Sequence, residues 1–182
     1  MANLNAPTRG EVSESNQAIF DNLEKGMGFV PNIYAYFAKN ETALADILAF
    51  QNRKTTLSAK EKEVIKLATS QINGCRYCQS AHSVLGKMNG FDDDQILEIR
   101  KGSASFDPKF DALAKLTASI VTNRGSASQE AKEAFFAAGY NEANLVDAVI
   151  VIGDITIGNY IGELTDFEID FPVAAELTLE NP

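Results

Sequence analysis

The chain has 182 residues and a mass of 19.7 kDa, and 45% of its residues are hydrophobic while 23% are charged. This size and composition are typical of one globular domain whose core needs no disulfide framework. With 16 Lys and Arg against 25 Asp and Glu, the net charge is -9, which disfavours nucleic acid and anionic membrane surfaces as partners.

Helical spacing of apolar residues recurs along most of the chain, and no segment shows a convincing strand alternation. We therefore expect an all-α fold. The expected helices, in chain order, are Asn16–Lys25, Ile33–Asn40, Glu41–Arg53, Ser58–Ile72, Cys75–Met88, Asp92–Lys101, Phe110–Arg124, Gln129–Ala138 and Asn144–Leu164.

Cap residues mark several of these ends. Ser58 with Glu61, and Asp92 with Gln95, have the spacing of capping boxes, and the pair Asn73–Gly74 is a typical helix stop. The segments 90–97 and 139–146 both run from a glycine through an aromatic and a capping residue into an apolar helix. Two similar helical halves would explain this echo, and convergent cap chemistry would explain it equally well.

The location of the protein follows from two segments. Residues 1–17 lack the basic and then apolar regions of a secretory signal, so we expect a cytoplasmic protein. The longest apolar stretch, Val146 to Ile157, is too short to cross a bilayer and carries Asp147 and Asp154. We expect it to lie in the most buried helix of the core and not in a membrane.

The most reactive side chains lie close together in the stretch NGCRYCQSAH, residues 73–82, which contains both cysteines and the only histidine. On one helix, Cys75, Cys78 and His82 share a face. Cys75 would lie in the first turn, where the helix dipole stabilises a thiolate, and the i,i+3 spacing lets the two sulfurs form a reversible disulfide. His82 follows Cys78 by one turn and can exchange its proton. The pattern predicts a redox site.

Glu63 is the candidate general base, because the turn at Asn73–Gly74 would fold its helix back across the cysteine face. By itself, among neighbouring lysines, Glu63 is also typical of a solvated helix charge. Two alternatives compete for the cysteines: buried packing between helices, and structural zinc with His82 and Glu63 as further ligands. Typical zinc sites instead use two separated ligand pairs from loops.

The pattern of Glu63, Cys75, Cys78 and His82 in a helical chain resembles the carboxymuconolactone decarboxylase superfamily, and within it the alkylhydroperoxidase D-like, peroxidase-related subgroup. The signature of these proteins is a glutamate, a CxxC pair 12 residues on, and a histidine four residues after the second cysteine, and each position is matched. The resemblance runs from about residue 28 to the segment Ile169–Pro172.

This resemblance implies an all-α helical bundle over residues 26–182, preceded by an N-terminal extension, residues 1–25. It implies a trimer or hexamer that reduces a hydroperoxide, or a partner's disulfide, with electrons from a thiol or dithiol donor and without a metal or organic cofactor. By this resemblance Cys78 would attack the peroxide, Cys75 would resolve it, and Glu63 and His82 would relay protons. The helix dipole alone favours Cys75 as the more acidic thiol, so the order within the pair stays open.

One position departs from the family pattern. Alkylhydroperoxidase D has a second histidine directly before its second cysteine, where this chain has Tyr77. Tyrosine, with a reference pKa of about 10, is a poor base, so Tyr77 would support the site or simply pack. We expect slow peroxidase turnover. The alternatives are a decarboxylase-like proton-transfer enzyme, which needs no thiols, and a non-enzymatic redox switch.

Overall fold

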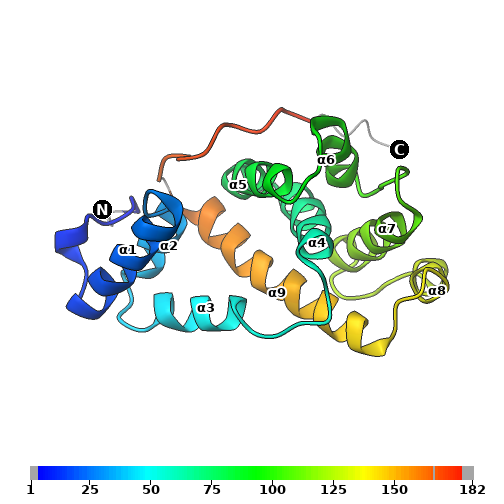
Figure 1. The fold of residues 1–182 in the computed structure, drawn as a ribbon, viewed down its shortest axis with the longest axis horizontal. Coiled ribbons are helices and arrows are strands. Elements are labelled where there is room, and N and C mark those ends of the chain that lie inside the picture. The colour runs from blue at the N-terminus through cyan, green and yellow to red at the C-terminus, as the bar shows by residue number, and fades with distance from the viewer. Residues whose placement is uncertain (1–3, 166, 178–182) are drawn as a thin grey trace.

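In the computed structural model, which describes residues 4–165 and 167–177, the chain is all-helical and the described residues contain no strand (Figure 1). The all-α prediction is confirmed. After a short 3₁₀ turn, η1 (Arg9–Glu11), the α-helices are α1 (Glu14–Met27), α2 (Asn32–Phe37), α3 (Ala43–Gln51), α4 (Ala59–Ile72), α5 (Arg76–Met88), α6 (Asp93–Arg100), α7 (Pro108–Thr122), α8 (Gln129–Ala137) and α9 (Glu142–Leu164).

The centre of the fold is α4, which packs against α5, α6, α7 and α9. Eight of the 14 residues of α4 are buried, but only seven of the 23 residues of α9. The expectation that the most apolar helix is the most buried is therefore wrong. Neighbouring helices cover one side of α9 and leave apolar side chains such as Val149 and Tyr160 exposed on the other.

Local signals set most helix ends as expected. Ser58 and Glu61 form the predicted capping box at the start of α4, and Asp92 and Gln95 form the one at the start of α6. Helix α7 begins earlier than predicted, because Asp107 caps it and a proline occupies its first turn, where a missing N–H costs no helical hydrogen bond.

The similar sequences of segments 90–97 and 139–146 form the same local structure. Gly90 and Gly139 have φ angles of 89° and 90°, a left-handed conformation that favours glycine. A buried aromatic residue follows each, and then a capping residue, Asp92 or Asn141, with a capping box. Helix α6 has eight residues and α9 has 23, so the similarity between the two segments is limited to the starts of these helices. That the fold consists of two similar helical halves stays a prediction.

The N-terminal part has a small core of its own, in which Val12 and Phe20 pack with Leu44 and neighbouring residues of α2. Helix α1 spans the predicted boundary between segments 1–25 and 26–182, so the extension continues directly into the helical domain. Positions 1–3 and 178–182 of these two segments lie outside the described residues. The division itself stays a prediction.

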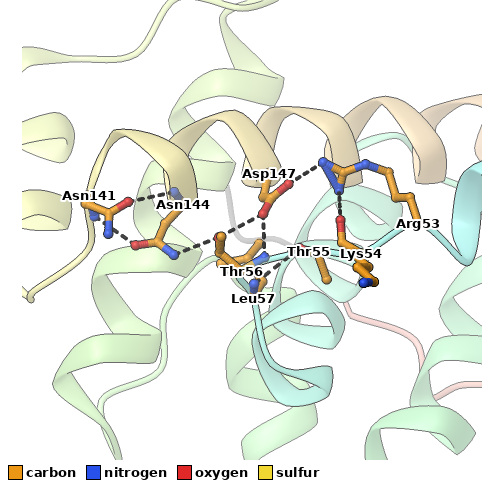
Figure 2. Close-up of polar contacts among 8 residues, drawn as sticks. All are labelled: Arg53, Lys54, Thr55, Thr56, Leu57, Asn141, Asn144 and Asp147. Carbon is orange, nitrogen blue, oxygen red and sulfur yellow. Dashed lines mark hydrogen bonds and ion pairs between the residues drawn. The ribbon is translucent and has the colours of Figure 1, made fainter.

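Asp147 of α9 anchors the loop that leads into α4 (Figure 2). Its Oδ2 accepts hydrogen bonds from Thr56, from the backbone N at 2.6 Å and from Oγ1 at 2.7 Å, and its Oδ1 pairs with Arg53. Burial opposes the charge of Asp147, but the hydrogen bonds from Thr56 and the Arg53 charge outweigh it, so its pKa lies below the usual range. The contact fixes the start of α4 against α9.

By length and composition alone, α9 is apolar enough to cross a membrane, and 39% of its most apolar window is buried inside this fold. Its two buried carboxylates, Asp147 and Asp154, are both paired with cations. The helix thus packs as part of the helical domain, as the sequence predicts, but with one face left uncovered.

Candidate redox site

Both cysteines lie at the start of α5, after the predicted turn, in which Gly74 has a φ of 81°. The helix begins one residue later than predicted. Cys75 is its N-cap and lies just before the first turn, and the Cys75 Sγ accepts a hydrogen bond from the backbone N of Cys78 at 3.2 Å. The two sulfurs are joined in a disulfide, with their Cα atoms 5.3 Å apart.

His82 and Glu63 form a buried pair between α5 and α4. The His82 Nδ1 lies 2.8 Å from the Glu63 Oε2, and the two residues are only 8% and 7% exposed. Burial opposes the carboxylate charge, but His82 and nearby lysines outweigh it, so the pKa of Glu63 lies below its usual range. An ionised carboxylate can only accept, so Nδ1–H donates and the ring leaves Nε2 for proton exchange. Glu63 is therefore not a solvated helix charge.

A cavity of about 110 Å³ lies against Cys78 and His82. Cys75 is fully buried at 0% exposure and does not line it, whereas Cys78 does. The wall is mostly apolar, with side chains that include Ile33, Phe37, Ile47, Leu85, Ile155 and Phe171. Of the two cysteines, Cys78 is the one that borders the cavity.

One part of the cavity wall is polar. Tyr34 donates a hydrogen bond to the Gln51 Oε1 at 2.8 Å, and the Gln51 Nε2 donates to Asp154 at 2.9 Å. The other oxygen of Asp154 lies 3.6 Å from the Lys66 Nζ. Burial, together with the charges of Asp154 and Glu63, raises the pKa of Tyr34 to about 12, so it remains a neutral donor. These four residues come from four helices, and sequence spacing alone does not group them.

The last described segment, residues 167–177, crosses over α5 in an extended conformation, and we call it the C-terminal strap (Figure 1). The backbone of Ala174 in this strap forms two hydrogen bonds with side chains of α5. The backbone N donates to the Ser80 Oγ at 3.0 Å, and the backbone O accepts from the Arg76 Nη2 at 2.8 Å. The strap thereby covers the helix that carries both cysteines.

Tyr77, between the two cysteines, binds this strap. Its hydroxyl donates to the Asp170 Oδ1 at 2.7 Å, and its ring makes edge contacts with Phe167 and Phe171. The other Asp170 oxygen accepts from the backbone N of Asn32, in α2, at 2.6 Å. Burial and the Asp170 hydrogen bond raise the pKa of Tyr77, so it packs and positions and does not act as a base at neutral pH.

Gly162 of α9 lies directly against the disulfide. A Cβ added at this position would lie 2.8 Å from the Cys75 Sγ and 3.8 Å from the Cys78 Sγ. Neither Gly162 nor Asp170 belongs to the sequence motif of Glu63, Cys75, Cys78 and His82. Helix α9 also contains Gly153 and Gly158, where an added Cβ would meet nothing within 4 Å, so only the tertiary structure identifies Gly162 as the glycine in close contact.

The sequence-predicted residues Glu63, Cys75, Cys78 and His82 meet at one place, with Tyr77 beside them. Within residues 4–165 and 167–177, no group of three or more His, Cys, Asp or Glu side chains is arranged to hold a metal ion. Instead, the two sulfurs bond each other and Glu63 bonds His82. This arrangement can perform thiol and proton-transfer chemistry.

The chain is similar to one protein family and to several solved structures. The sequence model of the carboxymuconolactone decarboxylase family matches residues 35–118. Comparison with curated protein sequences gives no significant match. Solved structures share the fold over nearly the whole chain.

An uncharacterised peroxidase-related protein from Silicibacter sp. TM1040 has a TM-score of 0.77 at 22% identity, over 90% of this chain and 91% of that one. A second, from Ralstonia eutropha JMP134 and described as an alkylhydroperoxidase AhpD core, has a TM-score of 0.79 at 17% identity, over 91% and 92%. A variant of the debrominase Bmp8 in complex with 2,3,4-tribromopyrrole has a TM-score of 0.75 at 16% identity, over 93% and 92%. At these identities the likeness demonstrates the fold alone.

Proposed function

Because this chain belongs to the carboxymuconolactone decarboxylase superfamily and has the fold of its alkylhydroperoxidase D-like members, we propose that it is a thiol-dependent oxidoreductase. Its substrate is a hydroperoxide or a partner's disulfide, and the reacting groups are Cys75 and Cys78. One observation carries the proposal. The disulfide partner that lines the cavity, Cys78, lies beside a histidine held by a buried carboxylate.

Cys78 is the thiol that attacks the substrate. It lines the cavity, whereas Cys75 is fully buried beneath α9 and the C-terminal strap. The hydrogen bond from the backbone N of Cys78 to the Cys75 sulfur stabilises a Cys75 thiolate, which suits Cys75 to attack the oxidised Cys78. Cys75 is the resolving residue.

The reaction balances in three steps. The Cys78 thiolate attacks the terminal oxygen of ROOH, the O–O bond breaks, and with one proton the products are ROH and a Cys78 sulfenic acid. The Cys75 thiol then attacks this sulfenic acid, which forms the disulfide and releases water. Two donor thiols R′SH reduce the disulfide by exchange and leave as R′SSR′.

Glu63 and His82 serve the proton steps. With Nδ1–H bound to the Glu63 carboxylate, His82 uses Nε2 to take the Cys78 proton and to return it to the leaving alkoxide. Glu63 orients the ring and stabilises the imidazolium. Tyr77 has no share in this relay, because its hydroxyl is bound to Asp170.

The electron donor is a separate thiol or dithiol, and the chemistry requires no metal or organic cofactor. We place the protein in the cytoplasm, where a reducing environment supplies such donors and regenerates the pair. Its acidic charge and helical domain fit a role without nucleic acid or membrane partners.

The protein acts as a homotrimer or homohexamer. Exposed apolar residues of α9 recur at helical spacing and form one stripe that neighbouring helices leave uncovered; they are Val146, Val149, Ile157, Tyr160 and Leu164. A stripe of this kind is typical of a helix that packs against a second copy. We call it the α9 stripe.

The test is turnover with cumene hydroperoxide and dithiothreitol, followed by thiol titration and intact mass. We expect consumption of many equivalents of peroxide, with reversible loss of both thiols. Cys75→Ser should stop turnover and leave a Cys78 sulfenic acid that dimedone traps, whereas Cys78→Ser should give neither turnover nor adduct. A dimedone adduct on Cys75 in the Cys78→Ser variant would reverse the roles.

The same assay separates the alternatives. Consumption that stops at one equivalent with dithiol present identifies a non-enzymatic redox switch. Activity on a lactone acid that survives Cys→Ser changes at both positions identifies decarboxylase-like proton transfer, which needs only Glu63 and His82.

Reductive debromination is a second candidate, favoured by the aromatic side chains Tyr34 and Phe37 in the cavity wall and by the fold shared with Bmp8. In that reaction two thiols become a disulfide while a C–Br bond is replaced by C–H and HBr leaves. Bromide release from tribromopyrrole, measured with the same cysteine variants, distinguishes it from peroxide reduction.

A further inference from the structure

A second candidate site lies at Arg100, on the other side of α5, the helix that carries both cysteines and that we call the redox helix. This residue ends α6 and is 2% exposed, which makes it one of the largest fully buried side chains among the described residues. Its Nε and Nη2 donate to the Gln71 Oε1 at 3.0 and 2.7 Å, and Nη2 also donates to the Gln79 Oε1 at 3.1 Å. All of these acceptors are neutral amides.

The charge of this buried guanidinium is therefore not balanced within the described residues. Arg76, a second cation, donates to the same Gln79 oxygen at 3.0 Å, and neither arginine forms an ion pair with a described carboxylate. Burial, and then the nearby charge of Arg76, lower the pKa of Arg100. Buried charges are normally paired, since an uncompensated one is costly.

A cavity of about 400 Å³ adjoins Arg100, between α5, α6 and the C-terminal strap. It shares no lining residue with the redox cavity. The Ser83 Oγ, in its wall, is buried and has no hydrogen-bond partner. The Arg100 Nη1 likewise makes no hydrogen bond to the described residues. Both residues therefore carry a donor that the described residues leave unused, and rotation about the Ser83 Cα–Cβ bond can bring its buried hydroxyl to the cavity without breaking a hydrogen bond.

The remaining lining residues indicate which kind of anion this cavity could bind beside Arg100. Lys87 lies at the cavity but is paired with Asp93 at 2.6 Å, so these two charges compensate each other. Most other lining side chains are apolar, among them Val84, Ile96 and Leu97. One unpaired cation with apolar walls fits a monoanion that carries a hydrocarbon chain better than a dianion such as phosphate, whose second charge would meet no unpaired cation among the lining residues.

We propose that this cavity binds a small aliphatic carboxylate. The carboxylate group accepts hydrogen bonds from Arg100 and Ser83, and the hydrocarbon chain lies along the apolar wall. Because Gln79 joins Arg100 to Arg76, which follows Cys75 directly, the bound anion compensates the positive charge beside the redox helix. The binding site itself is independent of the proposed oxidoreductase activity.

Isothermal titration calorimetry of the full-length protein with sodium hexanoate tests the proposal, with 1-hexanol and inorganic phosphate as comparison probes. We expect saturable binding of hexanoate that neither comparison probe matches. Ser83→Ala removes a hydroxyl that nothing else uses, so the variant should fold normally and bind hexanoate about tenfold more weakly, as expected for one hydrogen bond to a charged group.

Arg100→Gln should abolish binding, and its far-UV circular dichroism establishes whether this buried change leaves the fold intact. Lys101→Gln removes an adjacent, exposed charge outside the cavity, and this variant should bind hexanoate as the unchanged protein does. Weaker binding in Ser83→Ala than in Lys101→Gln, with binding lost in a folded Arg100→Gln, supports the site. No saturable binding, equal binding in Ser83→Ala and Lys101→Gln, or phosphate binding as tight as hexanoate overturns it.

Discussion

The Tyr77 hydroxyl donates a 2.7 Å hydrogen bond to Asp170, which joins the residue between the two cysteines to the C-terminal strap. The same carboxylate accepts from the backbone of Asn32, at the start of a helix that lines the redox cavity. One acidic side chain therefore connects the redox helix, the strap and the cavity wall.

Asp170→Ala should loosen this connection, because it leaves the Tyr77 hydroxyl and the Asn32 N–H without their acceptor. We expect a loss of about 1 to 3 kcal/mol in the free energy of unfolding and faster reduction of the disulfide by dithiothreitol. Urea unfolding and hydrogen exchange of the strap measure both effects. Glu168→Ala, at an exposed position of the same strap, is the matched control; equal strap protection in the two variants would contradict the role of Asp170.

Gly162→Ala should destabilise the oxidised protein, because the added Cβ would lie 2.8 Å from the Cys75 Sγ. Overpacking of this kind typically costs about 1 to 3 kcal/mol. Gly153→Ala is the control in the same helix, where an added Cβ meets nothing within 4 Å. There, helix propensity predicts a gain of up to about 1 kcal/mol. Urea titration of both oxidised variants gives the comparison, and a stabilising effect at both positions would exclude close packing at Gly162.

Glu63→Gln should lower kcat for peroxide reduction by about 10² to 10⁴, the usual contribution of a proton-transfer group, while the disulfide still forms. Glu130→Gln, at an exposed position of α8, should have no effect. Since the folded pKa of Glu63 is lowered, its carboxylate stays charged throughout the neutral range. Activity lost through its protonation should therefore appear only below its usual pKa of about 4.3. Turnover of Glu63→Gln within twofold of the unchanged protein would remove Glu63 from the relay.

Asp147→Asn should destabilise the fold in a pH-dependent way. The folded pKa of Asp147 is lowered, so its contribution is fully present above the unfolded value of about 3.9 and is lost as the pH falls through the folded pKa. We expect a difference of about 1 to 3 kcal/mol from the unchanged protein at pH 7 that shrinks on acidification below about pH 4. Urea unfolding at several pH values measures it, with exposed Asp46→Asn as control; a constant difference would refute the electrostatic cause.

Val149→Lys, in the middle of the α9 stripe, should convert the oligomer to smaller species, because a charge at 50% exposure is tolerated by a monomer but not within an apolar interface. Size-exclusion chromatography with light scattering gives the mass of each variant. Leu4→Lys, an exposed apolar residue outside α9, serves as control. An unchanged mass for Val149→Lys would place the subunit contact elsewhere.

Sequence patterns were most informative where the cause is local. The capping boxes at Ser58 and Asp92 and the stop at Gly74 depend on hydrogen bonds and φ angles within a few residues, and all three occur as predicted. The boundary at Cys75 differed by one residue, because a sulfur can serve as N-cap acceptor. Burial was harder to predict, since the apolar α9 is less buried than α4.

The sequence by itself determined the all-helical fold and the grouping of Cys75, Cys78 and His82, because helical period and i,i+3 spacing are properties of one segment. Only the tertiary structure decided that Cys78 faces a cavity and Cys75 does not, that Asp170 binds Tyr77, and that Arg100 is buried without a carboxylate. These relations join residues that are far apart in the chain or compare their burial, and both depend on how the helices pack, which no local pattern encodes.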